Sequence, residues 1–91
     1  MNSLKETVNY MTSDDYARRF IAEFWQAVIR YRKLSHILVN WERLPFTPDC
    51  PFKLLEDQAD ALIGYIDCLA RRAMIEKIDL WACRKEGDKN E

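Results

Sequence analysis

One stretch of the sequence, Leu44-Pro45-Phe46-Thr47-Pro48-Asp49-Cys50-Pro51, decides the fold. It contains all three prolines of a 91-residue chain that has only two glycines. Each proline removes a backbone hydrogen-bond donor and disfavours the helical conformation in the residue before it. The stretch is therefore a rigid turn, and Pro51 suits the first position of a following helix.

Apolar residues on both sides of this turn have the spacing of long helices. They recur in alternating steps of three and four residues, and Glu76 is the one break in the second series. The scarcity of glycine and proline excludes the frequent turns of an all-β fold. We therefore predict an all-α antiparallel helical hairpin with a proline-rich turn and with helices at about 13–42 and 51–82. The first series is Ala17, Phe20, Phe24, Ala27, Tyr31, Leu34, Leu38 and Trp41, and the second is Leu55, Ala59, Leu62, Ile66, Leu69, Ala73 and Leu80.

The two ends of the chain lack this pattern. Residues 1–11 are polar and weakly patterned, which predicts an N-terminal extension. Thr12 or Ser13 is positioned to cap the first helix, so the hairpin domain is expected to span residues 12–83. Residues 84–91 form a charged tail.

Each predicted helix has more apolar surface than one mutual interface covers. Ile21, Trp25 and Val28, for example, form a second stripe on the first helix. A core of this size contributes at most ~3–5 kcal/mol of stability, so we predict that the hairpins assemble as a homo-oligomeric bundle. The alternative is a third helix, from residues 3–10 or 76–83, that folds back as a lid.

Composition excludes several classes of function. A net charge of -1, from 14 basic and 15 acidic residues, argues against coating of long nucleic acids. Three cysteines without a CxxC pair and a single histidine, His36, predict neither a metal site nor a bound cofactor. His36 and Cys50 lack an evident acid or base partner, so no enzyme is expected. No apolar run approaches the ~20 residues of a membrane span, and free thiols suit a reducing cytoplasm.

Cationic side chains near aromatic ones indicate a binding site. Guanidinium groups bind phosphate in a bidentate manner, and aromatic rings stack on bases. We therefore predict that a small nucleotide binds between subunits, although the same residues also fit a plain surface and core. The candidate ligand-binding residues are Tyr16, Arg19, Gln26, Arg30 and Arg72.

Three segments resemble a family of small phage-encoded helical proteins over about residues 11–80. They are Met11-Thr12-Ser13-Asp14-Asp15-Tyr16, Ala22-Glu23-Phe24-Trp25-Gln26 and Phe46-Thr47-Pro48-Asp49-Cys50-Pro51. These proteins in turn resemble the hairpin domain of phage cyclic-nucleotide sponges, which include anti-CBASS and anti-Thoeris proteins. The resemblance implies compact homo-oligomers, commonly hexamers, that hold signalling nucleotides between protomers without cleaving them.

The same resemblance implies roles for particular residues. Tyr16 and Arg30 match a tyrosine and a cation that contact the ligand in the anti-CBASS relatives. The pair Arg72-Ala73 matches a second-helix pair that lines a further pocket. The glycine-rich start of the sponges' second helix has no counterpart here. Lys77 stands where the phage family often has glycine, so we expect the second helix to continue past it.

These observations support one leading hypothesis and two alternatives. The leading hypothesis is a phage anti-defence sponge in the cytoplasm of the infected bacterium. Its ligand is a cyclic di- or trinucleotide or a cyclic ADP-ribose-type signal. The first alternative is a protein–protein interaction module that inhibits a host protein through Trp25, Trp41 or Trp81. The second is a structural bundle without a ligand.

Overall fold

The computed structural model describes residues 1–83, and the predicted charged tail lies outside them. The elements in chain order are the 3-10 helix η1 (Leu4–Thr7), α1 (Val8–Met11), α2 (Tyr16–Val39), the 3-10 helix η2 (Trp41–Arg43) and α3 (Phe52–Glu76). No strand occurs in residues 1–83, which confirms the prediction of an all-α protein.

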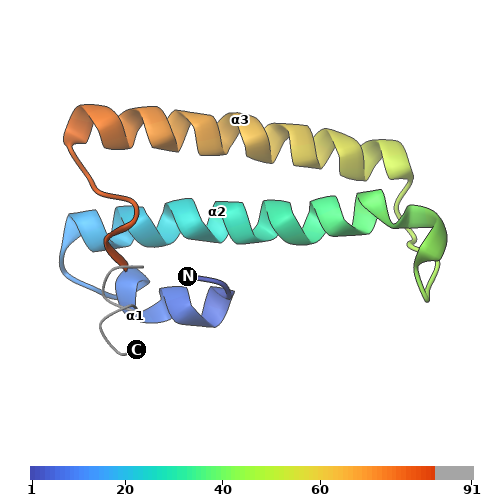
Figure 1. The fold of residues 1–91 in the computed structure, drawn as a ribbon, viewed down its shortest axis with the longest axis horizontal. Coiled ribbons are helices and arrows are strands. Elements are labelled where there is room, and N and C mark those ends of the chain that lie inside the picture. Colours follow the sequence, from blue (N-terminus) through green and yellow to red (C-terminus); the bar gives the residue numbers. More distant parts are fainter. Residues whose placement is uncertain (84–91) are drawn as a thin grey trace.

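The long helices α2 and α3 lie side by side and antiparallel (Figure 1). Along the chain they are connected by η2 and residues 44–51. The Asp15 side chain caps α2 by accepting a hydrogen bond from the Ala17 backbone N–H at 3.0 Å. The cap is therefore Asp15 and neither of the two hydroxyl residues before it. At the other end, the rings of Trp41 and Phe52 meet edge to face with centroids 5.2 Å apart, which joins η2 to the start of α3.

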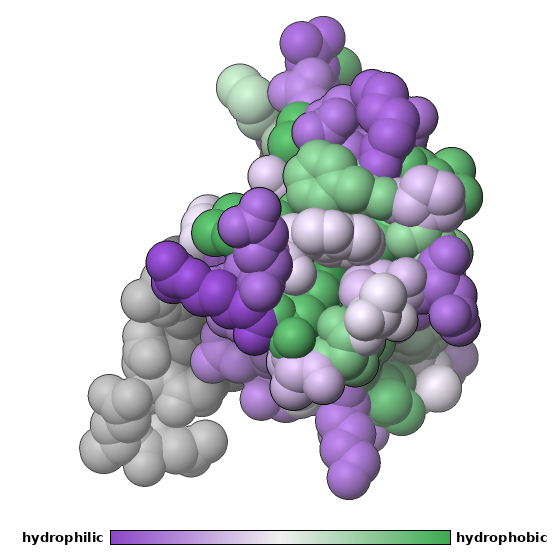
Figure 2. Space-filling view, turned by 90° about the vertical axis from the view of Figure 1, so that its right-hand side faces the viewer, coloured by the Kyte–Doolittle hydropathy of each residue, from purple (hydrophilic) through white to green (hydrophobic). Residues whose placement is uncertain are grey.

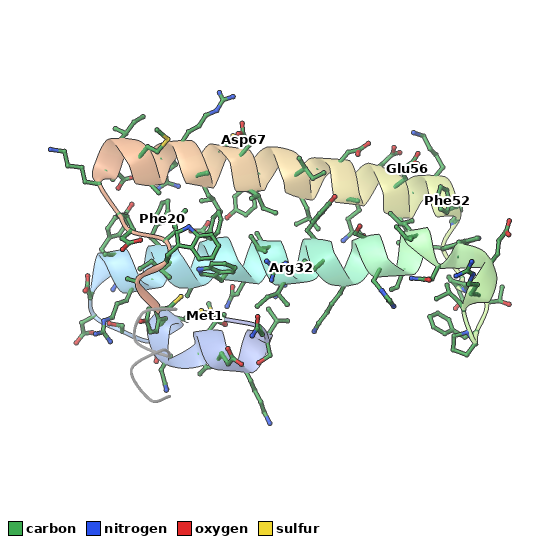
Figure 3. All side chains as sticks on the ribbon, in the orientation of Figure 1. Met1, Phe20, Arg32, Phe52, Glu56 and Asp67 are labelled. Carbon is green, nitrogen blue, oxygen red and sulfur yellow. The ribbon has the colours of Figure 1, made fainter. Side chains whose placement is uncertain are left out.

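The interface between α2 and α3 is built from the predicted apolar series. Phe20, Leu69 and Ala73 are buried together, and Phe24 packs against them. Figure 3 shows the Phe20 side chain directed from α2 toward α3, whereas Asp67 is directed away from α2. Helical spacing thus predicted which side chains form the core of the hairpin.

The second helix ends at Glu76, so the expectation that it continues to about residue 82 is wrong. Lys77 adopts the left-handed conformation, with φ 57° and ψ 43°, and the Ile78 N–H bonds back to the Ala73 carbonyl at 2.9 Å. Glycine usually occupies such a helix-ending position because it has no Cβ to clash. The conformation of Lys77 turns the chain so that Ile78 and Leu80 pack against the buried clusters on α2, and this packing offsets the strain of the lysine backbone.

Both ends of the described chain fold back onto α2. Tyr10, Ile21, Ala22 and Trp25 form one buried cluster, and side chains from both ends pack against it, namely Met1, Ile78, Leu80, Ala82 and Cys83. The Trp25 Nε1–H donates to the Leu80 carbonyl at 2.8 Å. We call residues 78–83 the C-terminal strap. It crosses α2 to reach α1 (Figure 1).

Residues 1–11 therefore do more than extend the hairpin. They form η1 and α1, and Thr7 and Tyr10 are buried. The alternative of a third helix that folds back as a lid holds for residues 3–10, which contain η1 and most of α1. Residues 78–83 also cover the second apolar stripe of α2, but they belong to none of the helices given above. This stripe is consequently satisfied within one chain.

The surplus of apolar surface remains on α3 and at the turn. Met74 and Ile75, at the end of α3, are each 81% exposed, and Leu54, Ile63 and Tyr65 are exposed as well. Figure 2 views the molecule from the turn end and shows apolar side chains at the surface among polar ones. None of the helices within residues 1–83 has the length and hydropathy to span a membrane.

Candidate functional site

A hydrogen-bonded cluster joins α2 to α3 at the end of the hairpin opposite the turn. The Tyr16 hydroxyl donates to Glu76 Oε1 at 2.7 Å, and Arg72 Nη2–H donates to the Tyr16 oxygen at 3.1 Å. The Arg72 Nε also lies 3.5 Å from Glu76 Oε2. Tyr16 is the first residue of α2 and Glu76 is the last of α3, so antiparallel packing brings them together. We call Tyr16, Phe20, Arg72 and Glu76 the open-end cluster.

The Phe20 ring packs against both Arg72 and Tyr16 of the cluster. The Arg72 guanidinium carbon lies 4.9 Å from the centroid of the Phe20 ring, a cation–π geometry. The Tyr16 and Phe20 rings are tilted by 57° with centroids 6.2 Å apart. Phe20 is buried while Arg72 is exposed. The ring therefore holds the guanidinium in a defined orientation in which solvent, or a ligand, still reaches it.

The cluster sets the protonation state of its phenol. The hydrogen bond to the Glu76 carboxylate raises the pKa of Tyr16, and desolvation and the negative charge of Glu76 add to this effect. Arg72 opposes it through its own hydrogen bond and charge. Tyr16 therefore remains a neutral hydrogen-bond donor at physiological pH, next to a fixed positive charge.

A cavity of about 590 Å³ adjoins the open-end cluster. Its volume lies within the usual range for small-molecule sites. The apolar part of its wall consists of Ala17, Ile21, Ile78 and Ala82. The wall also carries aromatic and charged side chains, namely Tyr10, Asp15, Tyr16, Arg18, Glu76, Lys77 and Asp79. We call this space the open-end cavity, and the start of the C-terminal strap forms one of its walls.

The structure brings together only some of the predicted ligand-binding residues. Tyr16 and Arg72 meet in the open-end cluster. Arg19 does not join them, because its Nη1–H donates to the Ser13 carbonyl at 2.8 Å and so secures the loop before α2. Arg19, the predicted ligand-binding residue nearest to Tyr16 in sequence, is therefore already hydrogen-bonded to a backbone carbonyl of its own chain.

Gln26 and Arg30 lie further along α2. The Gln26 Nε2 donates to Thr7 Oγ1 at 3.0 Å and to the Met11 sulfur, which ties the N-terminal segment to α2. Gln26 and Arg30 line a second, smaller hollow of about 150 Å³, together with Glu23, Ala27, Leu62 and Tyr65. Gln26 and Arg30 are therefore neighbours of each other but not of the open-end cavity.

Two features of the site were missed by the sequence reasoning. Glu76 is one of them, and its signal was its place as the break in the apolar series of α3. The other is the hydrogen bond that the Tyr65 hydroxyl donates to Glu23 Oε1. This bond, with desolvation and the charge of Glu23, raises the pKa of Tyr65, while Arg72 lowers it. No spacing signal distinguishes this pair from ordinary surface residues.

These contacts form a polar row along one side of the hairpin. It runs from the open-end cluster through the Tyr65–Glu23 pair to the second hollow. Residues 1–83 contain no group of three histidine, cysteine or carboxylate side chains arranged to bind a metal ion.

The helices that carry this row are also the part of the chain that matches a known family. The family model described as Sequestin matches residues 14–75, more than half of the 91-residue chain. The chain belongs to the Sequestin family. The matched range contains all five predicted ligand-binding residues, whereas Glu76 and the C-terminal strap lie beyond it. No curated protein and no solved structure matches the chain.

Membership of the Sequestin family confirms part of the predicted resemblance, namely the likeness to a family whose name denotes sequestration. That name suggests a protein that binds and holds a molecule rather than an enzyme. Within this Sequestin chain, the open-end cluster presents an oriented guanidinium beside a protonated phenol, and the guanidinium faces the Glu76 carboxylate.

Proposed function

We propose that this Sequestin protein sequesters a cyclic nucleotide signal without cleaving it. The observation that carries the proposal is the open-end cluster, in which Arg72 donates a hydrogen bond to Tyr16 and Tyr16 lines a cavity of about 590 Å³. The setting of the proposal is a phage protein that acts as an anti-defence sponge in the cytoplasm of the infected host. The ligand class is a cyclic di- or trinucleotide or a cyclic ADP-ribose-type molecule.

Arg72 is the proposed phosphate-binding residue. Its guanidinium now faces Glu76 at 3.5 Å in an exposed pair. Exposed ion pairs contribute little stability, so a phosphate can replace the carboxylate at small cost. A phosphate also accepts two parallel hydrogen bonds from the guanidinium fork, which the present contact with Glu76 does not provide. Tyr16 adds a neutral donor on the same side.

The open-end cavity is the proposed site of the base and sugar. Its apolar wall, which includes Ile21 and Ile78, offers a surface for a planar base, and the Tyr10 and Tyr16 rings border it. Arg18 and Lys77 contribute further positive charge, while Asp15 and Asp79 are acceptors for an exocyclic amino group. The cavity thus provides the three kinds of contact that a nucleotide needs.

We propose further that the ligand lies between subunits of a homo-oligomer, for which a hexamer is favoured. The apolar surface left on α3 supports assembly, since Leu54 and Ile75 are exposed in the single chain. Assembly also supports a role for Gln26 and Arg30, which a neighbouring subunit can bring to a shared ligand. Arg19 remains a candidate only if a ligand displaces its bond to Ser13.

The alternative is docking on a host protein through Trp25, Trp41 or Trp81, and one of these three tryptophans is buried. Trp25 is only 3% exposed and donates its indole N–H to the Leu80 carbonyl. Trp41 packs against the Phe52 ring. Trp81 is 49% exposed but its ring also meets Trp25 edge to face, with centroids 5.0 Å apart. The three tryptophans therefore do not form one exposed apolar face.

The direct test is calorimetry and native mass spectrometry of the assembled protein. The panel consists of cyclic dinucleotides, cyclic trinucleotides and cyclic ADP-ribose isomers. We expect one class to bind and to be recovered chemically intact after the protein is denatured. If the assembled protein binds no member of the panel, the proposal is overturned. Recovery of a cleaved ligand would overturn sequestration.

A further inference from the structure

One flank of α3 carries a seven-residue repeat that the hairpin leaves uncovered. Its members are Leu54, Ala61, Cys68 and Ile75, all of which are exposed. The buried residues of α3 are instead Ala59, Leu69 and Ala73, on the side that faces α2. A repeat of seven residues is the pattern by which two helices pack at a shallow crossing angle of about 20°. We call these four residues the α3 seam.

Gly64 lies beside the middle of the seam. A Cβ atom built on Gly64 meets nothing within 4 Å, so the chain itself has no steric need for glycine there. Glycine in the interior of a helix costs about 0.5–1 kcal/mol relative to alanine. With Ala61 and Cys68 close by, the centre of the seam is lined by small side chains. Such a centre permits close approach of a second helix.

The charges along α3 indicate the direction of that helix. The first half, residues 52–64, carries one cation and three carboxylates and is net acidic, whereas residues 65–77 carry three cations and two carboxylates and are net basic. The carboxylates of the first half are Glu56, Asp57 and Asp60, and the cations of the second half are Arg71, Arg72 and Lys77, beside Asp67 and Glu76. Ion pairs within the helix join Lys53 to Asp57 at 3.0 Å, Arg71 to Asp67 at 3.0 Å and Arg72 to Glu76 at 3.5 Å, and they leave the net charge of each half unchanged. A parallel copy would place like charges level with each other, whereas an antiparallel copy places the acidic half against the basic end.

We propose that α3 packs antiparallel against α3 of a second copy of this chain, about a two-fold axis between Gly64 and Tyr65. Leu54 then lies opposite the partner's Ile75, and Ala61 lies opposite the partner's Cys68. Asp57 lies one residue, about 1.5 Å along the axis, from the level of the partner's Arg71, on the same side of the seam. The largest side chains of the seam meet at its two ends, and the small ones meet at the centre.

The pairing also changes the composition of the site. Gln58, Tyr65 and Arg72 form a second row of seven-residue spacing beside the seam. The antiparallel order brings the partner's Gln58 to within one residue, about 1.5 Å along the axis, of the level of Arg72 at the open-end cluster. The inference thus rests on the proposed function for the ligand and deepens it, because two equivalent sites each gain a side chain from the other subunit.

Two neighbouring substitutions test the face. Met74 and Ile75 are both 81% exposed, but only Ile75 belongs to the seam. We expect Ile75→Glu to halve the solution mass measured by light scattering, or to reduce a larger assembly to smaller units, while Met74→Glu leaves the mass of the wild type. Both variants should retain wild-type helicity by circular dichroism. A monomeric wild type, or an equal response of the two variants, overturns the proposal.

Disulfide trapping tests the direction. In a Cys50→Ser, Cys83→Ser background, Cys68 is the only thiol. Antiparallel pairing offsets the two Cys68 residues by about 10 Å along the axis, which exceeds the Cα–Cα range of a disulfide. We therefore expect no covalent dimer from this background on oxidation, and efficient dimer formation when Ala61→Cys is added. Cross-linking through Cys68 alone, or none after Ala61→Cys, overturns the antiparallel order.

Both tests use the protein without ligand, which separates this inference from the proposed function. A dimer that shows the expected cross-link but binds no nucleotide would overturn the function and leave the pairing intact. A protein that binds a nucleotide but fails the mass and cross-linking tests would overturn the pairing and leave binding intact.

Discussion

The Tyr16 hydroxyl donates a hydrogen bond to Glu76 Oε1 at 2.7 Å, although 60 residues separate the two along the chain. The bond links the first residue of α2 to the last residue of α3, where the two helices would otherwise be free to splay. Arg72 completes the arrangement by donating to the same phenol oxygen. The end of the hairpin that lacks a covalent turn is thus closed by side chains, and these side chains form the candidate site.

The first prediction concerns Arg72 and its neighbour Arg71. Arg72→Gln should weaken nucleotide binding by about ten- to a hundredfold, because a charge-assisted hydrogen bond to phosphate is lost. Arg71→Gln is the matched control for the cluster, since Arg71 pairs with Asp67 at 3.0 Å outside it, and light scattering of this variant confirms that the subunits remain assembled. Titration calorimetry with the ligand found in the panel measures both variants. Equal affinities for the two variants would remove Arg72 from the site.

The second prediction concerns alkaline pH. Hydrogen bonds to carboxylates raise the pKa of Tyr16 and of Tyr65 above the ordinary value of about 10. The folded protein therefore holds these protons more tightly than the unfolded chain does. Their contribution to stability is complete below about pH 10 and is lost as the pH rises through the raised pKa values.

Tyrosinate absorbance in a pH titration measures this effect. We expect Tyr16→Phe to remove one late-titrating group and Glu76→Gln to move one titration back toward lower pH, since the amide carries no negative charge. Titration of the same variants in denaturant provides the unfolded reference. A wild-type profile that already matches the denatured one would contradict the prediction.

The third prediction concerns the C-terminal strap. Trp25→Ala should lower the free energy of unfolding by about 3–5 kcal/mol, because it empties a buried site and also removes the indole bond to the Leu80 carbonyl. Phe46→Ala, at an exposed ring in the turn, should change it by no more than about 0.5 kcal/mol. Urea unfolding followed by circular dichroism gives both values. Similar losses in the two variants would show that the strap contributes no core.

The fourth prediction concerns Lys77, whose φ of 57° is rare for a residue with a Cβ. Lys77→Gly should stabilise the unliganded protein by about 1 kcal/mol, since glycine adopts this conformation without strain. Lys77→Ala is the control, because alanine keeps the Cβ and should bring no such gain. Thermal unfolding compares the two. A gain in the alanine variant equal to that of glycine would assign the effect to the lost charge.

The hairpin was predictable because its two helices bury regular stripes. Leu69 and Phe20 sit in the predicted apolar series and are both buried in the structure. The lid was harder to predict, because residues 1–11 and 78–83 are too short to show a helical period. Thr7, for instance, is buried through its contacts with Leu4 and Gln26, and nothing in the local sequence distinguishes it from a surface threonine.

The contacts of the candidate site that depend on the hairpin were predictable from the sequence, whereas those that depend on the chain ends were not. Tyr16 and Arg72 come together because the antiparallel helices place their ends level, which follows from the position of the turn. Gln26 binds instead to Thr7, in a segment whose folding back was only an alternative at the level of sequence, and Arg19 binds to the Ser13 carbonyl in the loop before α2. The end of α3 depended on the backbone of one residue, Lys77, whose side chain gives no sign of a left-handed conformation.

Met1 and Cys83, the first and last residues that the structure describes, pack against the same buried cluster. During translation the C-terminal strap emerges from the ribosome only after α2 and α3, so Trp25 stays uncovered on one side until the strap has been synthesised. The fold is therefore completed only after the strap has emerged, and a product truncated before the strap lacks the segment that covers Trp25. Premature termination would leave an exposed tryptophan face on α2, a form that cellular quality control is suited to recognise and remove.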